Sequence, residues 1–334
     1  MTPDFAGHAR IMALADLVTP MSVRTAVTLR LADHLDAGDL TADDLAARTG
    51  TVPRPLRKLL DHLVHLGLLQ SAEGRYGLTD LGRLLRRGEA PMGPFDQLDL
   101  DTVLGRTELS AVHLLHKVRT GRSVYHGMYG TDLWTHVDRA QGVSEDLKAQ
   151  LAVPPGFDVD VLLDHPALAR ARTVVDVGGN TGALVEALLT RHPGLSATLI
   201  DLPSFAGAAA RRFEAAGLDG RAAAHAQDFF DPLPAGADVY VLSAVLADWD
   251  DETAVRLLRN CALAAGDTGC VLVSEVSLTE RLRHVDTGMT LWFEAVMDNP
   301  DRSPDDLAAL AAEAGLKVAA VGQAGTRIVL ELHG

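Results

Sequence analysis

Apolar residues recur at helical spacing through the first part of the chain. Between residues 10 and 150 they return mostly every three or four positions, as in Val23, Val27, Leu31 and Leu35. This spacing places apolar side chains on one face of a helix. The first part of the chain is therefore expected to be mainly helical.

Two helices and a hairpin are predicted within this part. Thr41 precedes the acidic start of a helix expected over Ala42–Thr49, where its side chain can cap the first turn. A second helix is expected over about Arg54–Leu66. The following segment, LGLLQSAEGRYGLTDLG, is typical of a short β-hairpin that turns at Ala72–Gly74.

The pattern changes after Arg172. Short strand-like runs, TVVDV, ATLID, DVYVLSAVL and CVLVSEV, alternate with segments rich in Ala, Leu and Arg. Such alternation favours a mostly parallel sheet covered by helices. The length of 334 residues suits two domains, and we place their join near residue 155, giving domains 1–155 and 156–334.

A helix–turn–helix followed by a hairpin is the pattern of a winged helix, which is used for DNA binding or for packing and dimerisation. The second helix carries Arg54, Arg57 and Lys58, but Asp61 and His62 dilute this basic face. The whole chain has 30 basic and 45 acidic residues and a formal net charge of −15. Phosphate binding needs a basic surface, so dimerisation is favoured and no nucleic-acid partner is expected.

Other sequence signals are few. The N-terminal segment lacks the features of a signal peptide, and no apolar run is long enough to cross a membrane, so a cytoplasmic protein without a membrane partner is expected. Cys261 and Cys270 have no metal-like spacing and are expected to be reduced. The 13 histidines form no HxH or HExxH pattern. No metal is therefore expected, although histidines from distant segments could still meet in space.

The segment TVVDVGGNTGALVEALLTR predicts a ligand-binding turn. Thr173–Val177 is expected to be a buried strand, Gly178–Gly182 a tight turn, and Ala183–Arg191 a helix. The turn fits GxGxxG of dinucleotide-binding proteins poorly. It is closer to the GxGxG turn of S-adenosylmethionine (SAM) enzymes, with Asn180 at the middle glycine, and Asn tolerates a positive φ.

Two later segments support this interpretation. Asp201 ends the next strand, 19 residues after Gly182, where a carboxylate can accept hydrogen bonds from ribose hydroxyls. Asp228 follows a third strand and can accept the adenine amino group, with Phe229 against the ring. Each carboxylate could instead belong to an ordinary loop. Three elements in the correct order make a coincidence improbable.

Several segments together resemble a known family. In chain order they are ADLVTPMSVRTAVTLRLADHL, YGTDLW, DVGGNTG, LIDLP, DFFDPLP and VLADWDDETAVRLLRNC. They are similar to the small-molecule O-methyltransferases of bacteria and plants, especially the polyketide- and anthracycline-tailoring branch. The resemblance covers residues 10–330. It implies an α-helical, winged-helix-like N-terminal dimerisation domain and a Rossmann-like α/β SAM-binding domain with a mostly parallel seven-stranded sheet.

The resemblance also implies a homodimer that binds SAM, releases S-adenosylhomocysteine and methylates a hydroxyl of a small-molecule acceptor. The implied cofactor-binding residues are Asp176, Gly178, Gly182, Asp201, Leu202, Asp228, Phe229, Ser243 and, from the first domain, Trp134. The implied substrate-binding residues are His113, His116, Asp286, Met289, Trp292 and Phe293. The spacing of the last three is equally consistent with a helix packed into the core.

The sequence departs from the family at the usual catalytic base. Family members commonly have a histidine in an LHDW context, whereas here the segment is Leu246-Ala247-Asp248-Trp249. Alanine cannot accept a proton. Three explanations remain open: transfer to an acidic phenol by proximity alone, another base, or loss of methyl transfer. The candidate bases are Asp248, His126, Tyr129, His113, His116 and His284.

A second departure lies in the loop 299–303, NPDRS, where the family usually has Gly-Gly-(Arg/Lys)-x-Arg-Thr. It suggests an unusual acceptor or a reshaped pocket entrance. The leading hypothesis is SAM-dependent O-methylation of an aromatic or polyketide metabolite, mainly by proximity. The alternative is a SAM-binding hydroxylase, decarboxylase or cyclase of the same family. A third hypothesis, a winged-helix regulator with a SAM domain as ligand sensor, conflicts with the acidic charge.

Overall fold

The computed structural model describes residues 5–87, 95–139, 158–276, 287–299 and 301–334. The chain forms two compact units, Met1–Glu108 and Leu109–Gly334, and each is considered by itself. This division lies well before the join expected near residue 155, because the helices after Leu109 associate with the α/β part of the chain. Residue 155 itself lies outside the described residues.

The first unit consists of short helices and a small antiparallel sheet of order β1-β3-β2. Its elements are α1 (Phe5–Leu14), α2 (Val18–Thr28), α3 (Leu31–Leu35), β1 (Leu40–Thr41), α4 (Ala42–Thr49), α5 (Pro53–His65), β2 (Leu69–Ala72), β3 (Arg75–Leu78), α6 (Asp80–Arg83), α7 (Phe95–Leu98) and α8 (Val103–Leu109).

Local sequence signals explain these elements. The Thr41 hydroxyl accepts a hydrogen bond from the Asp44 N–H at 3.1 Å, and the Asp44 carboxylate accepts one from the Thr41 N–H at 3.2 Å. This capping box satisfies N–H groups that the first turn of a helix leaves unpaired. Leu56, Leu60 and Leu63 are buried along one face of α5. The helix predicted over Ala42–Thr49 and the β2–β3 hairpin are confirmed. The winged-helix designation of the whole unit stays a prediction.

The second unit combines short helices with an α/β layer. Its elements are the 3-10 helix η1 (Ser110–His113), α9 (Leu114–Thr120), α10 (Tyr125–Tyr129), α11 (Leu133–Arg139), α13 (Asp160–Leu163), α14 (Pro166–Arg170), β4 (Thr173–Val177), α15 (Ala183–Arg191), β5 (Ser196–Asp201), α16 (Pro203–Ala215), β6 (Ala222–Ala226), β7 (Val239–Ser243), the 3-10 helix η2 (Leu246–Asp248), α17 (Asp251–Ala265), β8 (Cys270–Val276), α19 (Thr287–Val296), α20 (Pro304–Glu313), β9 (Lys317–Ala324) and β10 (Arg327–His333).

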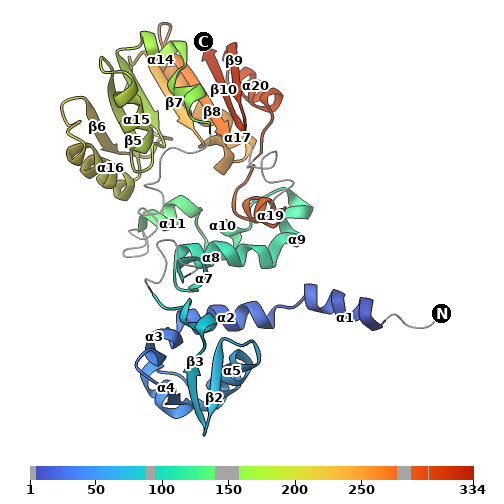
Figure 1. Ribbon diagram of the computed structural model, residues 1–334. Helices are drawn as coiled ribbons and strands as arrows, with labels where there is room; N and C mark the ends of the chain where they lie inside the picture. The colour runs from blue at the N-terminus through green and yellow to red at the C-terminus, as the bar shows by residue number, and fades with distance from the viewer. Residues whose placement is uncertain (1–4, 88–94, 140–157, 277–286, 300) are drawn as a thin grey trace. The chain divides into compact units, whose positions relative to one another are not determined.

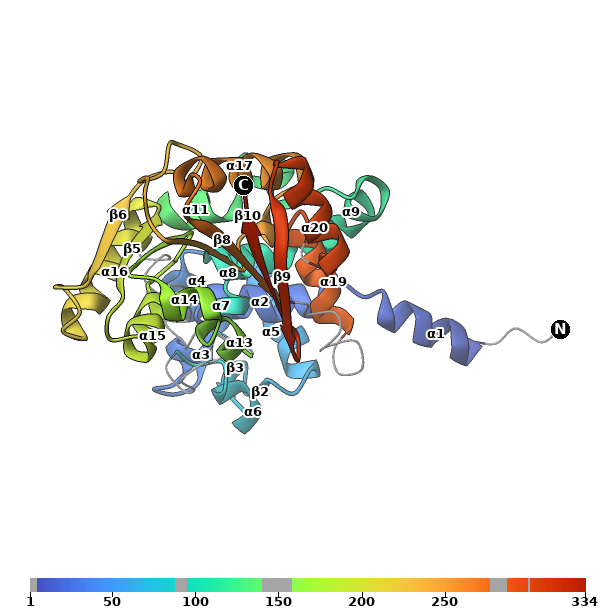
Figure 2. The ribbon, with the colours of Figure 1, turned by 90° about the horizontal axis from the view of Figure 1, so that it is seen from above.

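Seven strands form one sheet in the order β6-β5-β4-β7-β8-β10-β9 (Figure 1). The first five are parallel, and β10 lies antiparallel between β8 and β9. One face packs against α17 and α20, and the other against α13, α14, α15 and α16. Figure 2 shows α17 and α14 on opposite sides of the strands. The mostly parallel seven-stranded sheet expected from the sequence is confirmed.

The strand order changes direction at the boundary between β4 and β7. Strands β5 and β6 lie on one side of β4, whereas β7 and β8 lie on the other. In such sheets ligands bind beyond the carboxyl ends of the strands at this reversal. Among the described residues, no helix is both long and apolar enough to cross a membrane.

Candidate active site

A cavity of about 660 Å³ lies at the carboxyl ends of the parallel strands, within the second unit. Its volume suits a cofactor together with a small substrate. Of the described residues that line it, one is basic, Arg327, and six are acidic: Asp132, Asp176, Asp201, Asp228, Asp248 and Glu275. This excess of carboxyl groups favours a positively charged ligand, because opposite charges attract strongly where little water intervenes.

The turn after β4 has the geometry that the sequence predicts. Asn180 has a φ of 54° and Gly178 a φ of 75°. A Cβ on Gly178 would lie 2.9 Å from the Val245 side chain, so the residue must be glycine for conformational and steric reasons. The Asn180 N–H donates to Asp201 at 2.7 Å, which ties the turn to the end of β5.

Gly182 has a structural part in this turn. It caps α15 with a φ of 81°, and a Cβ there would lie 2.6 Å from the Phe213 ring. It therefore allows α15 to pack closely against α16. It is absent from the described lining of the cavity, whereas its neighbours Thr181 and Ala183 belong to it. A direct role of Gly182 in cofactor binding stays a prediction.

Two carboxyl groups are buried beside the turn. The Leu202 N–H donates to Asp201 at 2.7 Å. Burial raises the pKa of Asp201 to about 6. Burial, and secondarily the charge of Asp201, raise the pKa of Asp176 to about 7. One Asp176 oxygen is buried without a hydrogen-bond partner among the described residues. A buried unpaired acceptor and an acidic cavity fit the cationic, hydrogen-bond-donating SAM expected from the sequence.

The other expected cofactor residues, Leu202, Asp228, Phe229, Ser243 and Trp134, also line the cavity. Phe229 forms part of an aromatic wall, with its ring centroid 6.0 Å from that of Trp249 in an edge-to-face arrangement. Ser243 accepts a hydrogen bond from Arg327 at 3.2 Å. Trp134 lies on α11 and belongs to the second unit, whereas the sequence prediction placed it in the first domain. The structure thus brings these residues together at one cavity.

Ala247 and Asp248 lie in the wall of the same cavity. The Trp134 indole N–H donates to an Asp248 carboxyl oxygen at 2.7 Å. Burial raises the pKa of Asp248 to about 8, and the nearby acidic residues Glu275, Asp132 and Asp298 raise it as well. A carboxyl group with such a pKa can exchange a proton near neutral pH. Asp248 is therefore the candidate base that the geometry supports.

The remaining candidates do not line the described cavity. His126 is exposed on α10, His113 at the end of η1 and His116 on α9. Tyr129 packs against the rings of Tyr125 and His136, and Trp292 packs against Phe293. His284, Asp286 and the Met289 side chain lie outside the described part of the structure. The substrate-binding roles of these residues stay predictions.

Four charged residues around the site were not predicted from the sequence. Asp132, Glu275 and Arg327 line the cavity, and Arg302 lies behind it. The Glu275 carboxylate accepts the N–H groups of Val245 and Leu246 at 3.2 and 2.9 Å. A charged residue inside the apolar run CVLVSEV was a usable signal for Glu275. Nothing local distinguished the two arginines from exposed ones.

Arg302 holds the segment that contains Ala247 and Asp248. Its guanidinium donates to the carbonyl oxygens of Leu246 and Trp249, and to the Asp251 carboxylate at 2.8 Å. Its side chain is 2% exposed. Arg302, which belongs to the departing segment 299–303, therefore anchors the stretch 246–249.

Replacing Arg302 by Met is expected to lower the free energy of unfolding by about 2–3 kcal/mol, because the buried Leu246 carbonyl loses its donor. Urea unfolding of the two proteins measures the difference. Arg259→Met is the matched control, since Arg259 is exposed and donates to the Glu313 carbonyl. Equal stability of the Arg302 and Arg259 variants would contradict the anchoring role.

Comparison with known proteins agrees with this geometry. Residues 12–88 match the O-methyltransferase dimerisation domain, and residues 112–317 match the O-methyltransferase domain. The chain is 45% identical to 2,7-dihydroxy-5-methyl-1-naphthoate 7-O-methyltransferase of Streptomyces carzinostaticus over 94% of each chain. It is 39% identical to aclacinomycin 10-hydroxylase RdmB of Streptomyces purpurascens, over 94% of this chain and 85% of that one.

Among solved structures, the neocarzinostatin-pathway O-methyltransferase NcsB1 in complex with S-adenosyl-L-homocysteine is similar, with a TM-score of 0.84 and 42% identity over 96% of this chain and 99% of that one. A second NcsB1 structure, in complex with SAM and 2-hydroxy-5-methyl naphthoic acid, has a TM-score of 0.75 over 96% and 98% of the chains. The acidic cavity, the glycine-rich turn and these similarities lead to one conclusion: the chain belongs to the family of SAM-dependent O-methyltransferases that carry an N-terminal dimerisation domain.

Proposed function

We propose that this enzyme transfers the methyl group of SAM to a hydroxyl of an aromatic, naphthoate-like polyketide product. The similarity to a naphthoate O-methyltransferase over nearly the whole chain supports this acceptor class. The observation that carries the proposal is the position of Asp248, a half-buried carboxyl group in the wall of the cavity beside the alanine that replaces the usual histidine.

The residues around the turn would hold the cofactor. Asp201 would accept hydrogen bonds from the ribose hydroxyls, and Asp228 would accept one from the adenine amino group. Phe229 would pack against the adenine ring. Asp176 would provide the acceptor that the methionine part of the cofactor needs. When bound, SAM supplies an electrophilic methyl group on a positively charged sulfur. The carboxyl groups of the cavity favour this charge when they are ionised.

Positioning and proton removal are then divided between different residues. Beside Phe229, the rings of Phe230 and Trp249 limit water and confine a flat acceptor, which increases the rate by proximity. Trp134 fixes the Asp248 carboxyl group by its hydrogen bond. In its ionised form Asp248 accepts the proton of the acceptor hydroxyl as the methyl group is transferred. Proximity and one carboxylate thus replace the histidine base.

Incubation of the protein with methyl-labelled SAM and a series of hydroxynaphthoic acids tests the proposal. Label is expected in a methyl group bonded to the acceptor oxygen of one product, with an equal amount of S-adenosylhomocysteine. The alternative is a non-methylating reaction of the bound acceptor. The similarity to aclacinomycin 10-hydroxylase is the observation that supports this alternative. Conversion of an acceptor while the label stays in SAM would establish that alternative. Bound SAM with no acceptor of this class converted would contradict the proposed substrate class.

A homodimer is part of the proposal, because residues 12–88 match a dimerisation domain. Helix α1 has no buried residue within the single chain and exposes Phe5, Ile11, Met12 and Leu14. Burial of such a surface in a partner is the usual way to remove apolar area from water. The net charge of −15 favours no nucleic-acid partner. Light scattering that gave the mass of one chain at micromolar concentration would contradict the dimer.

A further inference from the structure

Three potential metal ligands come together at the end of the sheet remote from the cavity. Strand β10 pairs antiparallel with β8, and its last pair joins Leu332 to Val271. One residue further along, Cys270 and His333 therefore lie opposite each other. Side chains alternate between the faces of a strand, so Glu331 shares the face of His333. The register of two strands thus places a thiol, an imidazole and a carboxylate side by side.

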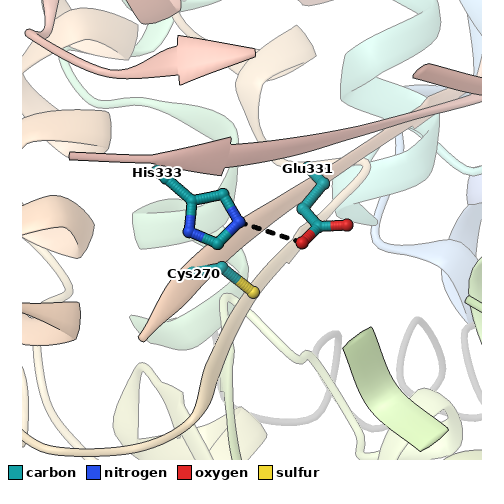
Figure 3. A group of neighbouring side chains, drawn as sticks. All are labelled: Cys270, Glu331 and His333. Carbon is teal, nitrogen blue, oxygen red and sulfur yellow. Dashed lines mark hydrogen bonds and ion pairs between the residues drawn. The ribbon is translucent and has the colours of Figure 1, made fainter. Parts of the chain in front are cut away.

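Figure 3 shows the three side chains directed toward one another. The His333 Nε2 atom lies 2.9 Å from a Glu331 carboxyl oxygen. One ligand atom from each of Cys270, Glu331 and His333 lies within 4.8 Å of the other two. In a tetrahedral zinc site neighbouring ligand atoms are about 3.3–3.8 Å apart. The group closes to that size by moving side chains about one ångström, and the half-exposed His333 can move.

A fourth residue supports the carboxylate. His165 precedes α14, and its Nε2 atom lies 3.8 Å from the second Glu331 oxygen. Its Nδ1 atom accepts the Ala167 N–H at 3.3 Å, which assigns the ring proton to Nε2. The ring therefore directs an N–H toward Glu331, as outer residues around metal-binding carboxylates do.

We propose that Cys270, Glu331 and His333 form a site for a divalent transition metal, with zinc the best match and a water molecule as fourth ligand. Mixed sulfur, nitrogen and oxygen donors suit zinc and its substitute cobalt, and exclude magnesium and calcium, which prefer oxygen alone. His333 is 46% exposed at its side chain and provides the entrance, whereas Cys270 is buried.

The site has no part in methyl transfer. Cys270 begins β8, and Glu275, which lines the cavity, follows five residues later. Five residues of strand span about 16 Å. The metal would instead join the ends of β8 and β10. Metal binding must displace the thiol proton, so the affinity is expected to increase with pH.

The experiment titrates Co²⁺ into chelator-treated, untagged full-length protein at pH 8. Saturation at one equivalent per chain is expected, with a near-ultraviolet thiolate-to-cobalt band and the visible bands of a tetrahedral site. Addition of Zn²⁺ should remove these bands and raise the thermal midpoint. Absence of saturable binding, or binding without the thiolate band, would overturn the proposal.

Matched variants assign the ligands. Cys270→Ser should abolish the thiolate band, and His333→Ala should weaken Co²⁺ binding by at least roughly tenfold, since a site of three protein ligands depends on each. Cys261→Ala and His225→Ala are the controls: Cys261 is buried in α17 and His225 is exposed on β6. Circular dichroism verifies that each variant is folded. If Cys270→Ser does not fold, the His333→Ala variant still tests the site, because His333 is partly exposed. Unchanged Co²⁺ binding by His333→Ala would refute the site.

Discussion

Replacing Asp248 by Asn is expected to reduce kcat/KM for the methylated acceptor roughly 100-fold or more, the usual contribution of a positioned general base. The change keeps the size of the side chain and an oxygen that can accept the Trp134 N–H. It removes the group that takes the proton. The affinity for SAM, measured by calorimetry, should change little. Initial rates with labelled SAM give the comparison.

The dependence of the rate on pH distinguishes catalysis by Asp248 as a base from catalysis by proximity alone. Burial raises the pKa of Asp248 to about 8, so the ionised form increases as the pH rises through that value. The wild-type rate should rise over the same range, and this limb should vanish in Asp248→Asn. A phenol near its ordinary pKa of about 10 would give a limb at higher pH in both proteins. Asp231→Asn is the control, since Asp231 is exposed and absent from the described lining. Equal rates for the two variants would mean that proximity suffices.

Asp201→Asn is expected to weaken SAM binding about 100-fold, since hydrogen bonds to a charged group contribute roughly 1.5–3 kcal/mol each and two would be affected. Turnover at low SAM should fall in proportion and recover partly when SAM is raised. Calorimetric titration of SAM measures the constant. Asp219→Asn, an exposed change beyond α16, provides the control. Wild-type affinity in Asp201→Asn would refute the assignment of the cofactor site.

The same carboxyl group predicts how binding depends on pH. Burial raises the pKa of Asp201 from 3.8 to about 6 in the protein without ligand. SAM favours the ionised form, so its affinity should decline as the pH falls through 6. The sign for stability is opposite: a raised pKa means that Asp201 contributes stability below pH 4 that is lost as the pH rises through 6. Saturating SAM should oppose that loss.

Local chemistry explains how much of the fold was predictable. The capping box at Thr41 and the strand–turn–helix over Thr173–Arg191 depend on neighbouring residues, and both were predicted with their observed bounds. The positive φ of Asn180 follows from its side-chain type and the glycines around it. The division of the chain into units depends on which distant helices pack together. The local pattern of apolar and polar residues does not contain that information. Trp134 was therefore assigned to the first domain.

The site was predictable to a similar degree. Residues that end parallel strands, such as Asp201 and Ser243, meet at one edge of a sheet as a consequence of topology, and they line the cavity. Arg302 and Arg327 approach from segments far along the chain. Their burial depends on carbonyl and hydroxyl partners that only the tertiary structure supplies. The pairing of Cys270 with His333 likewise required the register of β10 on β8.

The place of β10 in the sheet has a consequence for synthesis of the protein. Strand β9 reaches the sheet only through β10, which pairs with β8 on its other side. During synthesis, β9 leaves the ribosomal exit tunnel before its partner β10. It therefore cannot join the sheet until residue 333 has also emerged. The first unit can fold as it appears, since domains generally fold in order from the N-terminus. The catalytic unit can complete its sheet only afterwards, and a stalled ribosome would display an unpaired β8 edge to chaperones.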